Sequence, residues 1–390
     1  MSCHVSYSIL ASLSFSEKSP KLVFNAGSKD RTRSCLQPEK GCFFKYTLRR
    51  QTHIGYNKFC VLRKGGRALS GTNTIKHEET EKMIYNNVLE AAGNTPMIRL
   101  SRMVGPDDAQ VLVKYEGMNI GGSIKTRVAL KMIEEAEKRG DLKEDSIIVE
   151  PTSGNQGIGL ALVGAVKGYK TIIIMPDSVS VERRYLVSQY GAEVRLVHDD
   201  GNIGEAIEEC IQMAKRMKAE DPRVFMPDQF SNTDNLLAHT EGTGPEILRQ
   251  VDGPIHAFCS GIGTGGTITG IGRVLKKAWP EIRIVACEPE HAAILSGGSI
   301  GTHLQMGIGD GLIPDILDTS ICREIRIVTD EEAMYTTKQL ARQEGILCGI
   351  SAGTNVSVAL KLARELGKGK TVVTVLPDTG ERYFSTPLFQ

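Results

Sequence analysis

The sequence predicts an α/β fold built of doubly wound parallel sheets. From Met83 onward, short runs rich in β-branched residues alternate with amphipathic stretches, which is the pattern of parallel strands joined by helices. Two of the runs, 172–174 and 372–375, are almost entirely apolar, as expected for strands buried on both faces. Loops of glycine, serine and threonine follow several runs, and ligands of such folds bind beyond the carboxyl ends of the strands.

Local composition predicts the individual elements. β-branched and apolar residues predict strands at 111–115, 147–149, 172–174, 194–197, 256–259, 282–286 and 372–375. Apolar residues at helical spacing predict helices at 127–139, 158–166, 182–190 and 205–218. Two more helices are expected to begin in the loops at 263–267 and 349–354.

The first part of the chain differs from the rest. Residues 1–76 contain 14 Lys/Arg and 3 Asp/Glu, a balance of +11, so with a total of +1 the remainder carries 1 − 11 = −10. This segment is rich in serine and arginine and has no sustained apolar periodicity, which is typical of an organellar transit peptide. An extension upstream of a true start at Met83 explains the same composition. We therefore expect a basic leader over residues 1–82.

Composition excludes several classes of protein. The acidic body gives no support to a nucleic-acid-binding function. No run of 18 apolar residues occurs, so we expect no membrane span. The nine cysteines form no CxxC pair, so neither a metal site nor a disulfide framework is expected, and an intracellular location is the simpler interpretation.

A lysine follows a tight turn in the sequence Gly121-Gly122-Ser123-Ile124-Lys125. Ser123 is a candidate N-cap, so Lys125 falls in the first turn of a helix. The positive end of a helix disfavours an additional ammonium, which helps to keep the amine neutral and nucleophilic. A surface lysine on a capped helix has the same local sequence, so this motif alone does not define a site.

A second loop, residues 150–157, follows the strand predicted at 147–149 and reads Glu-Pro-Thr-Ser-Gly-Asn-Gln-Gly. Its two glycines let backbone N–H groups converge, and the next helix points its positive end at them. The loop therefore suits a carboxylate, although an ordinary turn between a strand and a helix also fits.

Two further loops open helices. Residues 260–270 read Ser-Gly-Ile-Gly-Thr-Gly-Gly-Thr-Ile-Thr-Gly, which lacks the Gly-Lys-Ser/Thr of a P-loop and suits a single monoester phosphate. Residues 349–354 present Ser351, a neutral hydroxyl that either caps the helix or contacts a ligand. An aldehyde-binding lysine, a carboxylate loop and a phosphate loop together indicate a pyridoxal 5'-phosphate enzyme that acts at the β-carbon of an amino acid.

The four loops, in this order and spacing, resemble those of the fold-type II pyridoxal phosphate enzymes, and within them the cysteine synthase (O-acetylserine sulfhydrylase) and cystathionine β-synthase family. The resemblance extends from about Met83 to the C-terminus. It also includes the segments 92–96 (Ala-Gly-Asn-Thr-Pro), 175–176 (Met-Pro), 182–184 (Glu-Arg-Arg), 243–246 (Thr-Gly-Pro-Glu) and 377–383 (Pro-Asp-Thr-Gly-Glu-Arg-Tyr).

The resemblance implies two doubly wound parallel-sheet domains with the active site in the cleft between them. A smaller, mobile substrate-binding domain would comprise 83–96 plus 119–229. A larger cofactor-binding domain would comprise 97–118 plus 230–390.

The resemblance also implies a role for each loop residue. Lys125 would be the Schiff-base lysine and later the proton shuttle, Asn155 would contact the ring oxygen of the cofactor, and Ser351 would face its pyridine nitrogen. Gly263, Thr264, Gly265, Gly266 and Thr267 would hold the phosphate. Thr152, Ser153, Gln156 and Gln229 would hold the substrate carboxylate.

The chain departs from the family pattern at several positions. Gln156 stands where many members have threonine, Ile120 where many have proline, and Thr126 where an aspartate commonly follows the lysine. Asp310 places a carboxylate where a small residue is usual, either as a base or amine ligand near the β-carbon or as a solvated loop acid. We take Thr126 and Asp310 as candidate specificity residues.

The resemblance implies β-replacement through an α-aminoacrylate, with cysteine synthase (O-acetylserine and sulfide to cysteine and acetate) as the leading activity. A cystathionine β-synthase-like or cysteine/serine β-lyase activity is the alternative, and a catalytically idle regulatory protein is an alternative of another class. A homodimer is expected, with serine acetyltransferase as a candidate partner. The location would be cytoplasmic, or plastid or mitochondrial if the leader is a transit peptide.

Overall fold

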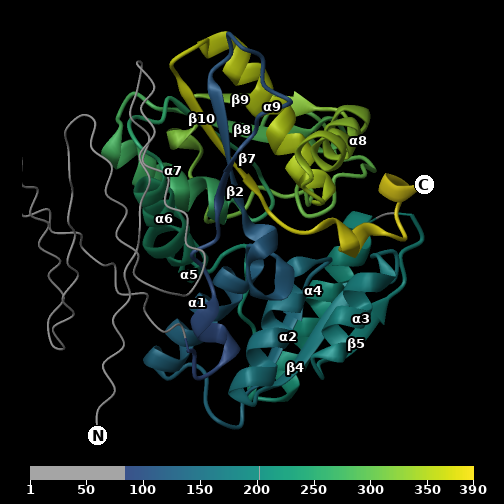
Figure 1. Ribbon diagram of the computed structural model, residues 1–390. Coiled ribbons are helices and arrows are strands. Elements are labelled where there is room, and N and C mark those ends of the chain that lie inside the picture. Colours follow the sequence, from purple (N-terminus) through teal and green to yellow (C-terminus); the bar gives the residue numbers. More distant parts are fainter. Residues whose placement is uncertain (1–83, 202) are drawn as a thin grey trace, which may run out of the picture. The chain divides into compact units, whose positions relative to one another are not determined.

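The computed structural model describes residues 84–201 and 203–390, so the predicted leader lies outside the described residues. The described chain forms two sheets (Figure 1). The larger has the order β1 (Met97–Arg99), β2 (Gln110–Tyr115), β10 (Thr371–Leu376), β7 (Ala257–Gly261), β8 (Arg283–Pro289) and β9 (Glu324–Val328). The smaller has the order β5 (Glu193–Val197), β4 (Lys170–Pro176), β3 (Ile147–Pro151) and β6 (Val224–Phe225).

All neighbouring strands are parallel except β1, which pairs antiparallel with β2. The parallel pairing of β2 with β10 joins Gln110 to Thr371 at one end and Tyr115 to Leu376 at the other. An early segment of the chain is thereby built into the sheet that contains its C-terminal strand. The chain then leaves for the smaller sheet and returns at β7.

Helices cover both faces of each sheet. The main helices are α1 (Lys125–Arg139), α2 (Asn155–Lys167), α3 (Val181–Gln189), α4 (Ile203–Glu220), α5 (Asp234–Leu237), α6 (Gly244–Gln250), α7 (Gly266–Ala278), α8 (Asp330–Gln339) and α9 (Ile350–Leu366). Two apolar clusters sandwich the large sheet, one under α8 and α9 and one under α6 and α7. Two others sandwich the small sheet, one under α1 and α2 and one under α4. The doubly wound α/β class predicted from the sequence is confirmed.

Element boundaries differ in detail from the prediction. The sequence analysis did not anticipate β1, β6 or β9, which are short or lie at a sheet edge where one face is partly exposed. Helix α2 begins at Asn155 rather than at 158, and glycines in its first turns let neighbouring elements approach closely: a Cβ on Gly157 would lie 2.8 Å from Ile173, and one on Gly159 would lie 2.9 Å from the backbone oxygen of Lys125. Helix α1 begins at Lys125 itself, and the Ser123 hydroxyl accepts its backbone N–H at 3.3 Å.

Five cysteines fall in the described residues, and all are free thiols. Cys210, Cys259, Cys287 and Cys348 are buried. Burial raises the pKa of Cys210 to about 12 and that of Cys322 to about 11, and it raises the thiol pKa values of Cys287 and Cys348 as well. No helix within the described ranges is both long enough and apolar enough to cross a membrane.

Candidate active site

The predicted site loops meet in one pocket between the two sheets. Residues 151–156 come from the carboxyl end of β3, and residues 260–267 come from the carboxyl end of β7. Of the predicted residues, the pocket is lined by Lys125, Thr152, Ser153, Asn155, Gln156, Gln229, Gly263, Thr264, Gly265, Thr267, Asp310 and Ser351. Within each sheet the parallel strands present their carboxyl ends at one edge, and loops from those edges of both sheets line the pocket.

Lys125 begins α1 and supplies the amine of the pocket. Its Nζ lies 3.4 Å from the Thr264 hydroxyl, so the lysine of one sheet's helix reaches the glycine loop of the other sheet. Dense packing around the amine disfavours the ammonium and lowers the pKa of Lys125 to about 8. The carboxylates of Asp310 and Glu150 oppose this shift without cancelling it. A substantial fraction of this amine is therefore neutral near pH 8.

The glycine loop between β7 and α7 is shaped to hold an anion. The backbone N–H groups of Gly263, Thr264 and Gly265 have no acceptor among the described residues. The loop is closely surrounded: a Cβ on Gly263 would lie 2.6 Å from the Gly307 oxygen, and one on Gly266 would lie 2.1 Å from Asn235 Oδ1. Unbonded N–H groups at a helix N-terminus bind phosphate. The loop therefore fits the phosphate of pyridoxal phosphate.

The loop after β3 has the features expected of a carboxylate site. The Thr152 hydroxyl accepts the Gly154 N–H at 3.2 Å, which orders the turn before α2. Gln156 is 1% exposed, and its Oε1 has no hydrogen-bond partner among the described residues. Gln229 reaches the same pocket from the loop after β6 and is also buried.

Glu150 connects these two loops and was not assigned a role from the sequence. Its carboxylate accepts the backbone N–H groups of Asp228 and Gln229 at 3.0 and 3.2 Å. Burial raises the pKa of Glu150 to about 8. The signal for this contact in the sequence was Glu150 itself, an acidic residue that begins the loop 150–157 directly after the strand predicted at 147–149.

Asp310 lies inside the pocket. Its Oδ2 would be 3.4 Å from a Cβ on Gly263, and no described residue forms a hydrogen bond with the carboxylate. Burial raises the pKa of Asp310, while Lys125, His303 and Arg183 oppose that effect. Asp310 thus lines the pocket, and its role as a specificity residue stays a prediction.

Three predicted residues have surroundings that the sequence did not suggest. Thr126 is absent from the pocket lining, and its hydroxyl donates to the Ile120 carbonyl at 2.6 Å, which holds the turn before α1. Gly266 also lies behind the lining, as the first residue of α7. Asn155 lines the pocket, but its amide donates to Asp378 at 2.6 Å and accepts from Arg382 at 3.0 Å.

Ser351 lies in the first turn of α9 and is 4% exposed. It lines the pocket from the large-sheet side, together with Asn355 one helical turn further on. The position of Ser351 in the pocket leaves its predicted contact with the pyridine nitrogen a prediction.

A buried ion cluster supports α1 beside the pocket, and the sequence analysis did not identify it. Arg127 forms paired hydrogen bonds with Glu116 (2.8 and 2.9 Å) and Glu246 (2.7 and 2.8 Å). Lys114 adds a contact of 2.7 Å to Glu246. These pairings raise the pKa of Arg127 and hold that of Glu246 at about 2. The only local signal for this cluster in the sequence was Arg127 itself, an arginine on the apolar face of the helix predicted at 127–139.

The comparisons with known proteins define the class. Residues 88–378 match the family model described as pyridoxal-phosphate dependent enzyme. The chain belongs to this family, and the cofactor inferred from its loops is confirmed.

The similar proteins narrow the class. Cysteine synthase of Staphylococcus aureus is 50% identical over 305 residues, which are 78% of this chain and 97% of the relative. The crystal structure of cysteine synthase from Entamoeba histolytica superimposes with a TM-score of 0.74 at 37% identity and covers 79% of this chain and 92% of that one. An O-acetylserine dependent cystathionine β-synthase from Helicobacter pylori gives a TM-score of 0.74 at 35% identity, covering 79% of this chain and all of that one.

Proposed function

We propose that this protein is a cysteine synthase, which converts O-acetylserine and sulfide into cysteine and acetate. One observation carries the proposal: a pocket joins an amine of lowered pKa, a buried carboxylate loop and a phosphate cradle. The 50% identity to a cysteine synthase over almost its whole length supports this substrate pair.

Each group in the pocket has a part in the reaction. The N-terminus of α2, the residues Thr152 and Ser153, and the amides of Gln156 and Gln229 bind the carboxylate of the amino acid. This orients its Cα–H bond toward Lys125. Residues 263–267 would hold the phosphate of pyridoxal phosphate and Ser351 would serve its ring nitrogen; when bound, the cofactor would supply an electron-withdrawing ring that stabilises the charge left on Cα.

Lys125 moves the proton. Its neutral amine accepts the α-proton, and acetate then leaves from Cβ. Sulfide adds at Cβ, and the ammonium of Lys125 returns a proton to Cα, so the overall exchange is acetate for a thiol. The packing that lowers the pKa of Lys125 makes both transfers accessible near neutral pH.

We further propose that the segments 83–96 plus 119–229 form the smaller, mobile domain and close on the large-sheet domain when the carboxylate binds. The pocket supports this, because its lining includes Thr152 from the loop after β3 of the small sheet and Gly263 from the loop after β7 of the large sheet. Closure would exclude water from the reacting Cβ. Reduced hydrogen exchange at 152–156 on addition of substrate would support closure, and unchanged exchange would contradict it.

A donor screen tests the activity. Protein loaded with pyridoxal phosphate is supplied with O-acetylserine plus sulfide, serine plus homocysteine, or cysteine alone, and cysteine, cystathionine and sulfide are quantified. We expect the first pair to give the highest kcat/KM. A higher kcat/KM for either of the others would replace cysteine synthase by the cystathionine β-synthase-like or β-lyase activity. No turnover in any mixture would favour the idle regulatory relative.

We also propose that the protein is a homodimer and that it binds serine acetyltransferase. Analytical ultracentrifugation measures the oligomeric state. Titration with a C-terminal peptide of the acetyltransferase, followed by cofactor fluorescence, measures the binding. Mass spectrometry of the native N-terminus decides whether residues 1–82 are a cleaved leader, and therefore whether the location is an organelle or the cytoplasm.

A further inference from the structure

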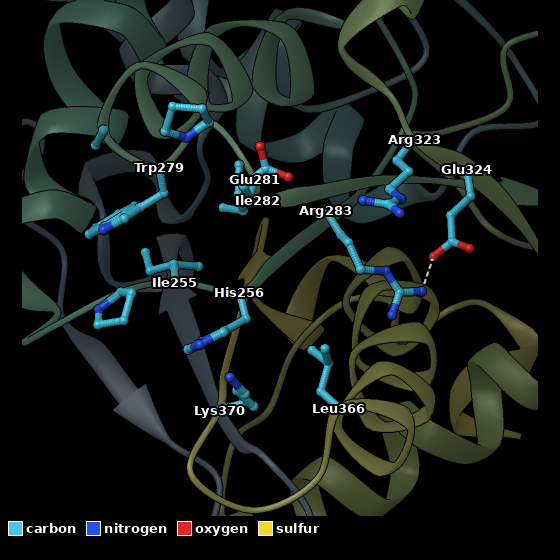
Figure 2. A pocket seen from close by; sticks show the side chains of 13 residues that line it. Ile255, His256, Trp279, Glu281, Ile282, Arg283, Arg323, Glu324, Leu366 and Lys370 are labelled. Carbon is cyan, nitrogen blue, oxygen red and sulfur yellow. Dashed lines mark hydrogen bonds and ion pairs between the residues drawn. The ribbon is translucent and has the colours of Figure 1, made fainter.

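A surface cavity of about 610 Å³ is bordered by the amino ends of β7, β8 and β10 (Figure 2). Figure 2 shows Trp279, Arg323 and Lys370 on separate sides of this open cavity. One small ligand would not contact all three side chains, so we assign no binding site to it.

The segment 377–383, Pro-Asp-Thr-Gly-Glu-Arg-Tyr, has no part in the proposed reaction. It follows β10, and Pro377 at its start lines the active-site pocket. The side chains of Asp378 and Arg382 are buried, at 0% and 4% exposure. Burying a charged group is costly unless hydrogen bonds compensate it. The hydrogen-bond partners of these two side chains therefore indicate what the segment does.

The segment holds the turn that precedes Lys125. The backbone N–H of Ile124 donates to the Pro377 carbonyl at 2.8 Å. From the other end of the segment, Arg382 Nη2 donates to the Gly121 carbonyl. The start of α1, and with it the amine of the pocket, is thus attached to the chain that follows β10.

The same segment holds the Asn155 amide at both of its ends. Asn155 Nδ2 donates to Asp378 Oδ2 at 2.6 Å, and Asn155 Oδ1 accepts from Arg382 Nη1 at 3.0 Å. A guanidinium can only donate, and a carboxylate accepts, so these partners decide which end of the amide is the oxygen and which is the nitrogen. If the amide turned over, both hydrogen bonds would be lost.

Asp378 is itself held in place. The Tyr383 hydroxyl donates at 2.6 Å to the same Oδ2 that accepts from Asn155. Burial and the neighbouring Asp378 raise the pKa of Tyr383, so the phenol keeps its proton and acts as a donor. The guanidinium of Arg183 in α3 lies over the Tyr383 ring, 4.9 Å from its centroid. The acceptor of the Asn155 amide is therefore part of a packed, hydrogen-bonded group.

The Asn155 amide has one N–H left over. Nδ2 carries two N–H groups; one donates to Asp378, and the other has no acceptor among the described residues. Asn155 lines the pocket. We propose that Asp378 and Arg382 are positioning residues that hold the Asn155 amide so that this N–H donates to the ring oxygen of pyridoxal phosphate. A reversed amide would present its own oxygen to that acceptor. The proposal rests on the predicted contact between Asn155 and the ring oxygen.

Cofactor binding tests the proposal directly. The cofactor-free protein is titrated with pyridoxal phosphate, and the absorption spectrum of the bound cofactor is recorded. D378A should raise the Kd about fivefold, the size expected for one lost hydrogen bond, and should displace the absorption maximum in the same direction as N155A does. R382M should raise the Kd further, because the contact with Gly121 is also lost.

Two further variants are controls. D378N keeps an acceptor oxygen for the Asn155 amide and should bind within about twofold of the wild type. S385A removes an exposed contact with Glu182 on the same stretch of chain and should leave both the Kd and the spectrum unchanged. Equal weakening in D378N and D378A, at the same melting temperature, would overturn the proposal, and this comparison suffices if R382M does not fold.

A double-mutant cycle separates positioning from general support of the fold. In the N155A background, D378A should weaken cofactor binding by less than about twofold, because the amide that Asp378 holds is already gone. Equal losses in the two backgrounds would overturn the proposal, and so would wild-type binding and spectrum in N155A or in D378A. None of these readouts requires turnover, so they are independent of the donor screen that tests the proposed activity.

Discussion

Two groups of buried charges lie next to each other on α1, and they differ in whether their charges are paired. Around Arg127, two carboxylates and two cations are fully paired at 2.7–2.9 Å. Around Lys125, two residues earlier, the carboxylates of Glu150 and Asp310 influence the amine only through space, and among the described residues Nζ forms its one hydrogen bond with the Thr264 hydroxyl at 3.4 Å.

This difference in charge pairing separates a cluster that holds α1 in place from a cluster whose groups can exchange protons. Full pairing at Arg127 keeps Glu246 ionised and ties α1 to the turn that follows β2 and to α6. At Lys125, Glu150 and Asp310 burial is not offset by an ion pair, so it lowers the pKa of the amine and raises the pKa values of the two carboxyl groups, toward the range where proton transfer is efficient. The paired cluster positions the helix on which the unpaired amine depends.

Removing the amine should have the largest effect on activity. K125A should lower kcat/KM by more than about 10³-fold, because both the attachment point of the cofactor and the proton acceptor are lost. Its urea unfolding midpoint in the cofactor-free form should not fall, because a poorly solvated amine is removed. K138A, at the exposed end of α1, is the control and should retain wild-type activity. Residual activity above 1% in K125A would contradict the assignment.

Breaking the paired cluster should instead affect folding. R127M leaves the carboxylates of Glu116 and Glu246 buried without their main partner and should cost about 3–5 kcal/mol of unfolding free energy, measured by urea denaturation. R139A, on the same helix, removes partly exposed contacts to Asp141 and Asp234 and should cost less than about 1 kcal/mol. Equal losses in the two variants would show that Arg127 has no special structural role.

The pH dependence of the unfolding free energy should reveal the contribution of the ionised Glu246 carboxylate. Its pKa is about 2 in the folded protein against an ordinary value of 4.5, so its stabilising effect is complete above pH 4.5 and is lost as the pH falls toward 2. E246Q should therefore show a flatter decline of the urea midpoint between pH 5 and 3 than the wild type does. Parallel declines in the two proteins would place the acid-sensitive group elsewhere.

The smallest effect concerns the pH profile of cofactor attachment. The rate at which the cofactor-free enzyme combines with pyridoxal phosphate should rise through a midpoint near pH 8, since the neutral amine of Lys125 reacts. Because the Asp310 carboxylate raises the pKa of Lys125, D310N should move that midpoint to lower pH. Stopped-flow absorbance measures both, and a shift to higher pH would contradict the placement of Asp310 beside the amine.

The sequence predicted the parts of the fold and site that depend on local pattern. Apolar runs such as 172–174 and 372–375 identified central strands, and glycine loops after strands identified the pocket. Edge strand β9 was not predicted, although its sequence Glu-Ile-Arg-Ile-Val alternates; it is five residues long, and Ile327, one of its apolar side chains, is exposed. The contacts of Arg127 and Glu150 were not predicted, because the most distant partner of each lies 119 and 79 positions away in the sequence. Patterns in a single sequence do not reveal such pairs.

Thr126 and Asn155 illustrate a further limit. Both were identified from motif position, and the contacts of each depend on residues outside the motif. The Thr126 hydroxyl turns back to Ile120, while the Asn155 amide is shared with Asp378 and Arg382 near the C-terminus. Position in a motif correctly predicted that Asn155 lines the pocket but not that Thr126 lies outside its lining, and it did not predict which groups compete for the hydrogen bonds of either residue.

The raised pKa values of the cysteines have a consequence for a protein that handles reduced sulfur. Disulfides, persulfides and alkylating reagents attack or are attacked by thiolates, not thiols. Among the described cysteines, Cys210, Cys287, Cys322 and Cys348 remain protonated at physiological pH. The polypeptide's own sulfur atoms are thus poor competitors for the electrophiles that sulfide metabolism produces, and the protein should tolerate an oxidising challenge without crosslinking through these positions.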